Sequence, residues 1–86
     1  MSDGIKDEAP AAPVLTEYDR RNAPIYLRLL DAEREGADWR QAAQALLDVR
    51  PDDDPTAARR RYESHLARAR WMTSEGYRAM LQTGRR

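Results

Sequence analysis

The stretch from Asp38 to Leu66 constrains the fold of this 86-residue chain more than any other. It contains an apolar-faced segment, WRQAAQALLDV, then a proline- and aspartate-rich connection, RPDDDP, and then an arginine-rich segment, TAARRRYESHL. Two short helices joined by a tight turn form the core of a helix-turn-helix. We therefore expect a helix-turn-helix here, with the other helices of the chain packed around it.

The first of the two segments has the clearest helical periodicity in the chain. Its apolar residues recur at i, i+3, i+4, i+7 and i+8, and they are Trp39, Ala42, Ala43, Leu46 and Leu47. Asp38, with Gln41 three residues later, predicts a capping box at its start. The connection is about six residues long, whereas the common helix-turn-helix has a turn of about three or four. We expect Asp54 to cap the next helix and Pro55 to occupy its first position.

Further helices are predicted on both sides of this pair. The upstream helix should begin near Asn22, carry Pro24 in its first turn and end at Gly36. Its apolar stripe consists of Ile25, Tyr26, Leu29, Leu30 and Ala32. The arginine-rich helix has a stripe of Ala58, Tyr62, Leu66, Ala69 and Met72, with a half-buried His65 at its edge. A short fourth helix should restart at Thr73 or Ser74, and its Tyr77, Met80 and Leu81 should close the bundle.

A chain of this length supports one small core. The predicted fold class is therefore all-α, a small three- to four-helix variant of the helix-turn-helix with a lengthened turn. Residues 1–19 are acidic, contain Pro10 and Pro13 among alanines, and have few large apolar side chains. Such a segment buries too little surface to offset its ordering entropy, so we expect a disordered acidic tail. The domain should then span residues 20–82, followed by a basic flexible end at residues 83–86.

Nothing in the sequence predicts catalysis, a metal site or a cofactor. His65 is the single histidine and the chain has no cysteine, so no second soft ligand accompanies it. Asp52, Asp53 and Asp54 lack the alternating spacing and the final glutamate of a calcium loop. The chain also lacks a signal-peptide pattern and an apolar run of about eighteen residues. We therefore predict a non-enzymatic, cytoplasmic protein without a cofactor.

The charges are sorted along the chain although the net charge is zero. Residues 1–19, 20–54 and 55–86 carry net charges of −4, −2 and +6. DNA binding needs a basic surface for the phosphates, and its candidate residues here are Arg59, Arg60 and Arg61. The preceding connection would repel phosphates at short range. We interpret it as a DNA-repelling turn made of Asp52, Asp53 and Asp54.

Taken together, these features resemble a known family, the extended-turn helix-turn-helix domain of proteobacterial regulators of conjugative-element transfer. The resemblance covers about residues 20–82. It includes the long turn, the arginine-rich third helix, the ending Gly76-Tyr77-Arg78-x-Met80-Leu81 and the motif Gly36-Ala37-x-Trp39-Arg40-x-x-Ala43-x-Ala45-Leu46. In that family, activators join this domain to a second, N-terminal domain. The domain binds DNA with one basic side and packs on its companion with the other.

A stand-alone acidic copy of this domain resembles the antiactivators of the same family. The resemblance then implies a monomer that binds the N-terminal domain of a transcriptional activator in place of the activator's own helix-turn-helix domain. Neither nucleic acid nor membrane would be a partner. The outcome would be repression of the transfer of an integrative and conjugative element under quorum-sensing control. The candidate contact residues lie off the core stripes and are Leu27, Arg34, Trp71 and Tyr77. The alternative is a small DNA-binding helix-turn-helix repressor or excision-type factor.

Overall fold

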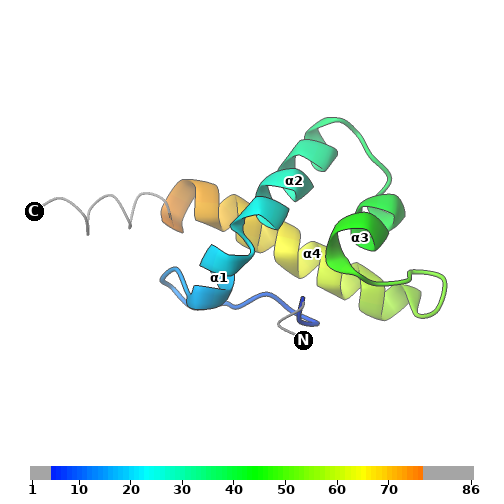
Figure 1. The fold of residues 1–86 in the computed structure, drawn as a ribbon, viewed down its shortest axis with the longest axis horizontal. Helices are drawn as coiled ribbons and strands as arrows, with labels where there is room; N and C mark the ends of the chain where they lie inside the picture. The colour runs from blue at the N-terminus through cyan, green and yellow to red at the C-terminus, as the bar shows by residue number, and fades with distance from the viewer. Residues whose placement is uncertain (1–4, 77–86) are drawn as a thin grey trace, which may run out of the picture.

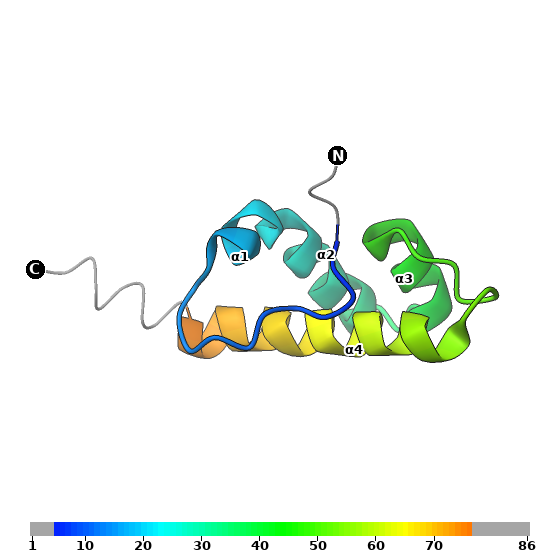
Figure 2. The ribbon, with the colours of Figure 1, turned by 90° about the horizontal axis from the view of Figure 1, so that it is seen from below.

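One long helix, α4, carries the other elements of the fold (Figures 1 and 2). The computed structural model describes residues 5–76. Its elements are α1 (Glu17–Arg21), α2 (Ala23–Arg34), α3 (Trp39–Leu47), α4 (Pro55–Trp71) and a π-helical turn, η1 (Met72–Gly76). Figure 2 shows the three shorter helices on the same side of α4. The described residues contain helices and no strand, which confirms the predicted all-α class.

The ends of α2 and α4 lie where the sequence signals predict them. Pro55 occupies the first turn of α4, and the Asp54 carboxylate accepts a hydrogen bond from the backbone N–H of Ala57 at 3.1 Å. At the end of α2, Gly36 adopts a φ of +79°, the left-handed conformation that lets a chain leave a helix. Asp38 lies at the N-cap of α3, but its side chain makes no capping hydrogen bond. The capping box predicted there is therefore wrong.

The hydrophobic core lies where α2, α3 and α4 meet. Its buried cluster consists of Leu29, Ala42, Ala43, Leu47, Tyr62 and Leu66. All six belong to the predicted apolar stripes, because residues three and four apart lie on one face of a helix. Ala42 and Ala43 of α3 are buried against the neighbouring helices, and small side chains at such positions let helices approach closely.

The N-terminal segment, residues 5–16, lies along α4, and we call it the strap (Figure 2). The Arg68 guanidinium donates hydrogen bonds to the backbone carbonyls of Ala12 (2.7 Å) and Val14 (2.9 Å). The backbone N–H of Ala9 donates to Ser64 Oγ at 3.0 Å. The composition of residues 1–19 predicts a disordered tail, but composition shows only how much apolar surface a segment can bury. It takes no account of hydrogen bonds to the backbone of the segment. In the structure, side chains of α4 bind the backbone of the strap, and residues 17–19 belong to α1.

The C-terminal end of α4 runs directly into η1. The hydroxyls of Thr73 and Ser74, the predicted start of a new helix, instead donate to the carbonyl of Arg70 at 3.1 and 3.0 Å. Such hydroxyl bonds to a preceding turn continue a helix and do not cap a new one. Tyr77, Met80 and Leu81, which were predicted to close the bundle, lie outside the described residues. Among the helices of residues 5–76, none has the length and apolar character required to cross a membrane.

Candidate nucleic-acid interface

One face of α4 is left uncovered by the other helices. Its exposed side chains recur at helical spacing, and they are Thr56, Arg59, Arg60, Glu63, Ala67 and Arg70. We call this set the α4 face. It lies opposite the side of α4 on which α2 and α3 pack (Figure 2). Three of its members are arginines and one is a glutamate, so the face is basic although the chain is neutral.

The predicted arginine triplet divides between two sides of α4. The side chains of Arg59 and Arg60 are 48% and 56% exposed, whereas that of Arg61 is 17% exposed. Arg61 donates to the backbone carbonyls of Leu47 (3.0 Å) and Asp48 (3.3 Å). These carbonyls end α3 and have no partner within the helix. Arg61 therefore fastens the end of α3 to α4, and Arg59 and Arg60 remain on the α4 face.

Each arginine of the α4 face has a carboxylate neighbour. The pairs are Arg59 with Glu63 at 2.6 Å, Arg60 with Glu8 at 3.9 Å, and Arg70 with Glu33. Solvent-exposed ion pairs contribute only about 0–1 kcal/mol each. A phosphate group therefore competes with these carboxylates at little cost.

Trp39, the first residue of α3, lies at the seam between α3 and α4. Its ring centroid is 5.9 Å from that of Tyr62, which anchors it on the core. The guanidinium carbon of Arg59 lies 4.9 Å from the centre of the indole ring, and that of Arg40 lies 5.0 Å from it. Guanidinium groups at this distance are attracted to the negative face of an aromatic ring. One indole thus holds an arginine from each helix of the helix-turn-helix.

The acidic turn lies at the N-terminal end of α4, and its three aspartates are exposed. Asp54 is the N-cap of α4, and the backbone N–H of Asp53 donates to the carbonyl of Arg50 at 3.0 Å. Capping thus accounts for one of the three carboxylates. The carboxylates of Asp52 and Asp53 remain in solvent beside the end of the α4 face.

A buried polar cluster joins α1 and α2 to α4, and the sequence patterns did not predict it. Asp19 is fully buried and receives hydrogen bonds from Arg68 (2.7 and 3.1 Å) and from the Tyr26 hydroxyl (2.8 Å). Burial alone would raise the pKa of Asp19, but the hydrogen bonds from Arg68, Thr16 and Tyr26 outweigh it and lower the pKa to about 2. Burial raises the pKa of Tyr26, and the hydrogen bond that Tyr26 donates to Asp19 and the charge of Asp19 raise it further. Asp19 is therefore ionised and Tyr26 neutral at physiological pH.

His65 lies beside this cluster and is fully buried, not half-buried as predicted. Tyr18 of α1 covers it, with its hydroxyl 2.7 Å from Nε2 of His65. The Nδ1 atom lies 2.8 Å from the carbonyl of Arg61. Burial lowers the pKa of His65, which makes it a structural neutral imidazole. For the polar cluster as a whole, the sequence contains one signal, the capping-box pattern Thr16-x-x-Asp19. In the structure, Thr16 and Asp19 exchange hydrogen bonds at the start of α1.

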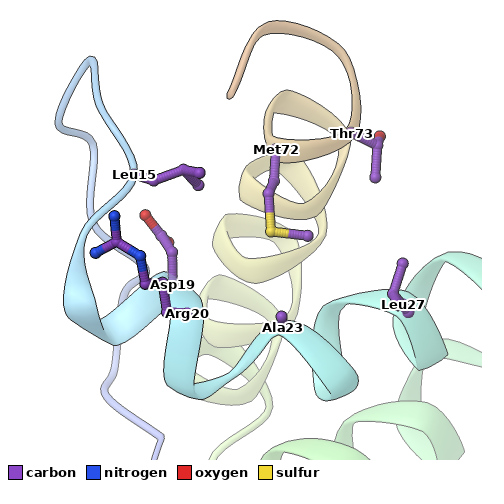
Figure 3. A pocket seen from close by; sticks show the side chains of 7 residues that line it. All are labelled: Leu15, Asp19, Arg20, Ala23, Leu27, Met72 and Thr73. Atoms are coloured by element: carbon purple, nitrogen blue, oxygen red, sulfur yellow. The ribbon is translucent and has the colours of Figure 1, made fainter. Parts of the chain in front are cut away.

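A cavity of about 540 Å³ lies between the end of the strap, α1, α2 and η1 (Figure 3). It is lined by Leu15, Asp19, Arg20, Ala23, Leu27, Met72 and Thr73. Figure 3 shows the side chains of Leu15 and Met72 extending into it. Most of the lining is apolar, and the carboxylate of Asp19 is already bound by Arg68. The other polar side chains of the lining also have partners, because Arg20 pairs with Glu17 at 3.9 Å and the Thr73 hydroxyl donates to the carbonyl of Arg70.

The structure places the predicted contact residues at several sites. Leu27 lies on α2, is exposed and lines the cavity. Arg34 lies in the last turn of α2 and pairs with Asp31. Trp71 is half-buried, with the Arg68 guanidinium 3.9 Å above its ring. Tyr77 lies outside the described residues.

A helix with an exposed basic face, held by a short helix across a turn, defines a class: small helical DNA-binding domains. The particular family follows from comparison with known proteins. The chain belongs to the RovC DNA-binding domain family, described as "T6SS, Transcription factor, DNA binding domain", whose model matches residues 3–82. No match was found among curated proteins. The family consists of transcription-factor domains and not enzymes, which confirms the prediction that this chain is not an enzyme.

The family corrects the predicted partner. The neutral chain and the acidic turn predicted a protein partner, the N-terminal domain of an activator, and no nucleic acid. Membership in a family of DNA-binding domains overturns that prediction, because it makes DNA the partner. The net charge was a misleading guide to DNA binding because it sums the whole chain, whereas Arg59, Arg60 and Arg70 of α4 lie on one exposed face. The resemblance noted in the sequence holds at the coarser level of a small helical domain of transcription regulators.

Proposed function

We propose that this chain binds duplex DNA through the α4 face as the DNA-binding domain of a transcription regulator. Its membership in a family of transcription-factor DNA-binding domains carries the proposal. The position of Arg59 and Arg60 supports it, because a recognition helix presents its N-terminal residues to the major groove. Both lie in the first half of α4 and both are exposed.

In this proposal the arginines of the triplet have different roles. Arg59 and Arg60 contact DNA, and each gives up an exposed carboxylate partner, Glu63 or Glu8, to do so. Arg61 serves the fold, because it is mostly buried and binds the carbonyls that end α3. Asp52 and Asp53 repel phosphates at the same end of α4. Each such charge near the surface opposes phosphate binding by about 1 kcal/mol.

The test is a titration of a labelled duplex, first of random sequence, at several salt concentrations. The native protein should bind with an affinity that falls steeply as salt rises. The variant Arg59→Gln/Arg60→Gln should bind more than about tenfold more weakly, with a salt slope smaller by about two.

The matched control is Arg20→Gln/Arg34→Gln, which removes two exposed arginines from α1 and α2. It should bind like the native protein. A further variant, Arg61→Gln, should lower the thermal unfolding midpoint, which the Arg59→Gln/Arg60→Gln variant should leave nearly unchanged. The proposal fails if the native protein shows no salt-dependent binding, or if both double variants bind equally well.

A further inference from the structure

Trp39 holds two guanidinium groups that come from different helices. Arg40 follows it in α3, and Arg59 reaches it from α4. The ring is half-buried, and its contact with Tyr62 fixes it to the core. The indole therefore has a fixed position from which to orient both arginines.

Arg40 differs from the arginines of α4 in its electrostatic surroundings. Arg59, Arg60, Arg61, Arg68 and Arg70 each have a carboxylate partner. For Arg40, no carboxylate in the part of the chain that the structure describes comes within ion-pair distance. Its neighbour on the ring, Arg59, is also a cation, and the two guanidinium carbons lie 5.0 and 4.9 Å from one ring centre. A phosphate that approaches the indole therefore meets positive charge from both helices.

We propose that Arg40, Arg59 and Trp39 form a phosphate-binding site at the seam of α3 and α4. It extends the DNA surface from α4 onto the start of α3, and it rests on the proposed DNA-binding function. Arg40 and Arg59 would contact backbone phosphates of the duplex. Trp39 is a positioning residue, because stacking restricts the conformations of both side chains before DNA arrives. Less conformational entropy is then lost when the phosphate binds.

The site adds sequence-independent contacts to those of the α4 face. Contacts to phosphates fix the register of a protein on the duplex, whereas contacts to base edges read the sequence. In the common helix-turn-helix the first helix crosses the DNA backbone, and the start of α3 corresponds to that position. Loss of Arg40 should therefore weaken binding to every DNA sequence by the same factor.

The test compares Arg40→Gln with Arg28→Gln in the salt-dependent duplex titration. Arg28 is an exposed arginine of α2 and has no carboxylate partner within residues 5–76, so it is a matched control. Arg40→Gln should weaken binding several-fold on both random and selected duplexes and reduce the salt slope by about one. Arg28→Gln should leave both quantities unchanged.

A double-mutant cycle tests the role of Trp39. Trp39→Phe keeps an aromatic ring and should retain most of the affinity for duplex DNA. Trp39→Leu should weaken DNA binding about as much as Arg40→Gln does. In the Trp39→Leu background, adding Arg40→Gln should have a smaller effect than in the native protein, because the arginine is no longer oriented. Thermal unfolding of each variant separates loss of binding from loss of fold. If Trp39→Leu does not fold, the comparison of Arg40→Gln with Arg28→Gln still shows whether Arg40 contributes to phosphate binding.

The outcomes separate this site from the proposed function. If Arg59→Gln/Arg60→Gln loses binding while Arg40→Gln and Arg28→Gln bind alike, DNA binding by the α4 face stands and the seam site is overturned. If the effects of Trp39→Leu and Arg40→Gln simply add, Trp39 does not act through Arg40 and its positioning role is overturned. If the native protein does not bind duplex DNA, both proposals are overturned together.

Discussion

At the scale of single residues, the hydrogen bonds of His65 define its protonation state. Its Nδ1–H donates to the carbonyl of Arg61, and its Nε2 accepts a hydrogen bond from the Tyr18 hydroxyl. The hydroxyl oxygen of Tyr18 in turn accepts from the backbone N–H of Lys6 at 3.0 Å. A protonated imidazole would direct a second N–H at this hydroxyl, whose own hydrogen would lose its acceptor. Protonation is therefore disfavoured by hydrogen bonding as well as by burial.

The buried imidazole predicts a pH-dependent stability. Because burial lowers the pKa of His65 in the fold, the unfolded chain takes up a proton first as the pH falls below about 6.5. The contribution of His65 to the free energy of unfolding is complete above that pH and decreases below it. Urea unfolding at pH 7.5 and pH 5.5 should show lower stability at pH 5.5 for the native protein. The difference should be smaller for His65→Gln, and an equal pH dependence in both proteins would contradict this account.

The polar cluster also shows what could not be predicted from the sequence at this scale. The hydrogen bond between Tyr18 and His65 spans 47 positions of the chain, and that between Asp19 and Arg68 spans 49. Apolar periodicity locates the buried face of each helix, but it contains no information about which distant polar groups meet. Nothing in the periodicity therefore distinguishes the buried side chain of Arg68 from the exposed arginines of α4.

At the scale of elements, the strap lies beside α4 and brings negative charge to it. Asp7 pairs with Arg61 at 2.8 Å, and Glu8 lies 3.9 Å from Arg60. Both carboxylates are mostly exposed. A DNA phosphate that approaches Arg60 therefore meets two negative charges held next to the α4 face.

We expect neutralisation of the strap to strengthen DNA binding. The variant Asp7→Asn/Glu8→Gln should raise the affinity for random duplex a few-fold at low salt, because exposed pairs contribute only about 0–1 kcal/mol. Its thermal unfolding midpoint should change little, since the side chains of Ser64, which accepts, and Arg68, which donates, still hydrogen-bond to the backbone of the strap. The control is Glu17→Gln/Asp31→Asn, which removes two exposed charges from α1 and α2. Equal affinities for these two variants would show that the strap does not screen the α4 face.

Helix boundaries were more predictable than the strap, for a physical reason. Helix ends depend on local chemistry, such as the Asp54 cap, Pro55 and the positive φ of Gly36. Each of these signals lies within a few residues of the helix end that it marks. The strap depends on the side chains of a helix more than 50 positions away. The role of Arg61 could not be predicted for the same reason. The carbonyls at the end of α3 that it binds come close to it only when the turn between α3 and α4 is folded.

At the scale of the whole molecule, opposite charges meet at one end of the α4 face. The acidic turn precedes α4, and Arg59 and Arg60 follow within its first turns. The net charge of zero hides this arrangement. The long-range attraction of DNA to such a molecule is weak, so binding depends on close contacts and on salt.

The acidic turn therefore predicts a gain of affinity on neutralisation. Asp52→Asn/Asp53→Asn should raise the affinity for duplexes of any sequence by up to about thirtyfold near physiological salt, because each of the two charges opposes the phosphates by up to about 1 kcal/mol. Asp54 is left unchanged, since its carboxylate caps α4. The unfolding free energy should stay within about 0.5 kcal/mol of the native value, as for other surface substitutions. An unchanged affinity, equal to that of the Glu17→Gln/Asp31→Asn control, would show that the turn does not repel DNA.

The position of α4 in the fold also affects how this protein can change. α4 packs against α2 and α3 and holds the strap, yet Thr56, Arg60, Glu63, Ala67 and Arg70 are exposed and do not belong to the hydrophobic core, whose edge Arg59 reaches at the rings of Trp39 and Tyr62. The requirements of folding and of recognition therefore fall mostly on different residues of one helix. A library randomised at positions 56, 63 and 67 should retain the fold in nearly all members and vary in the DNA sequence that each prefers. A domain built in this way can acquire a new operator without first becoming more stable.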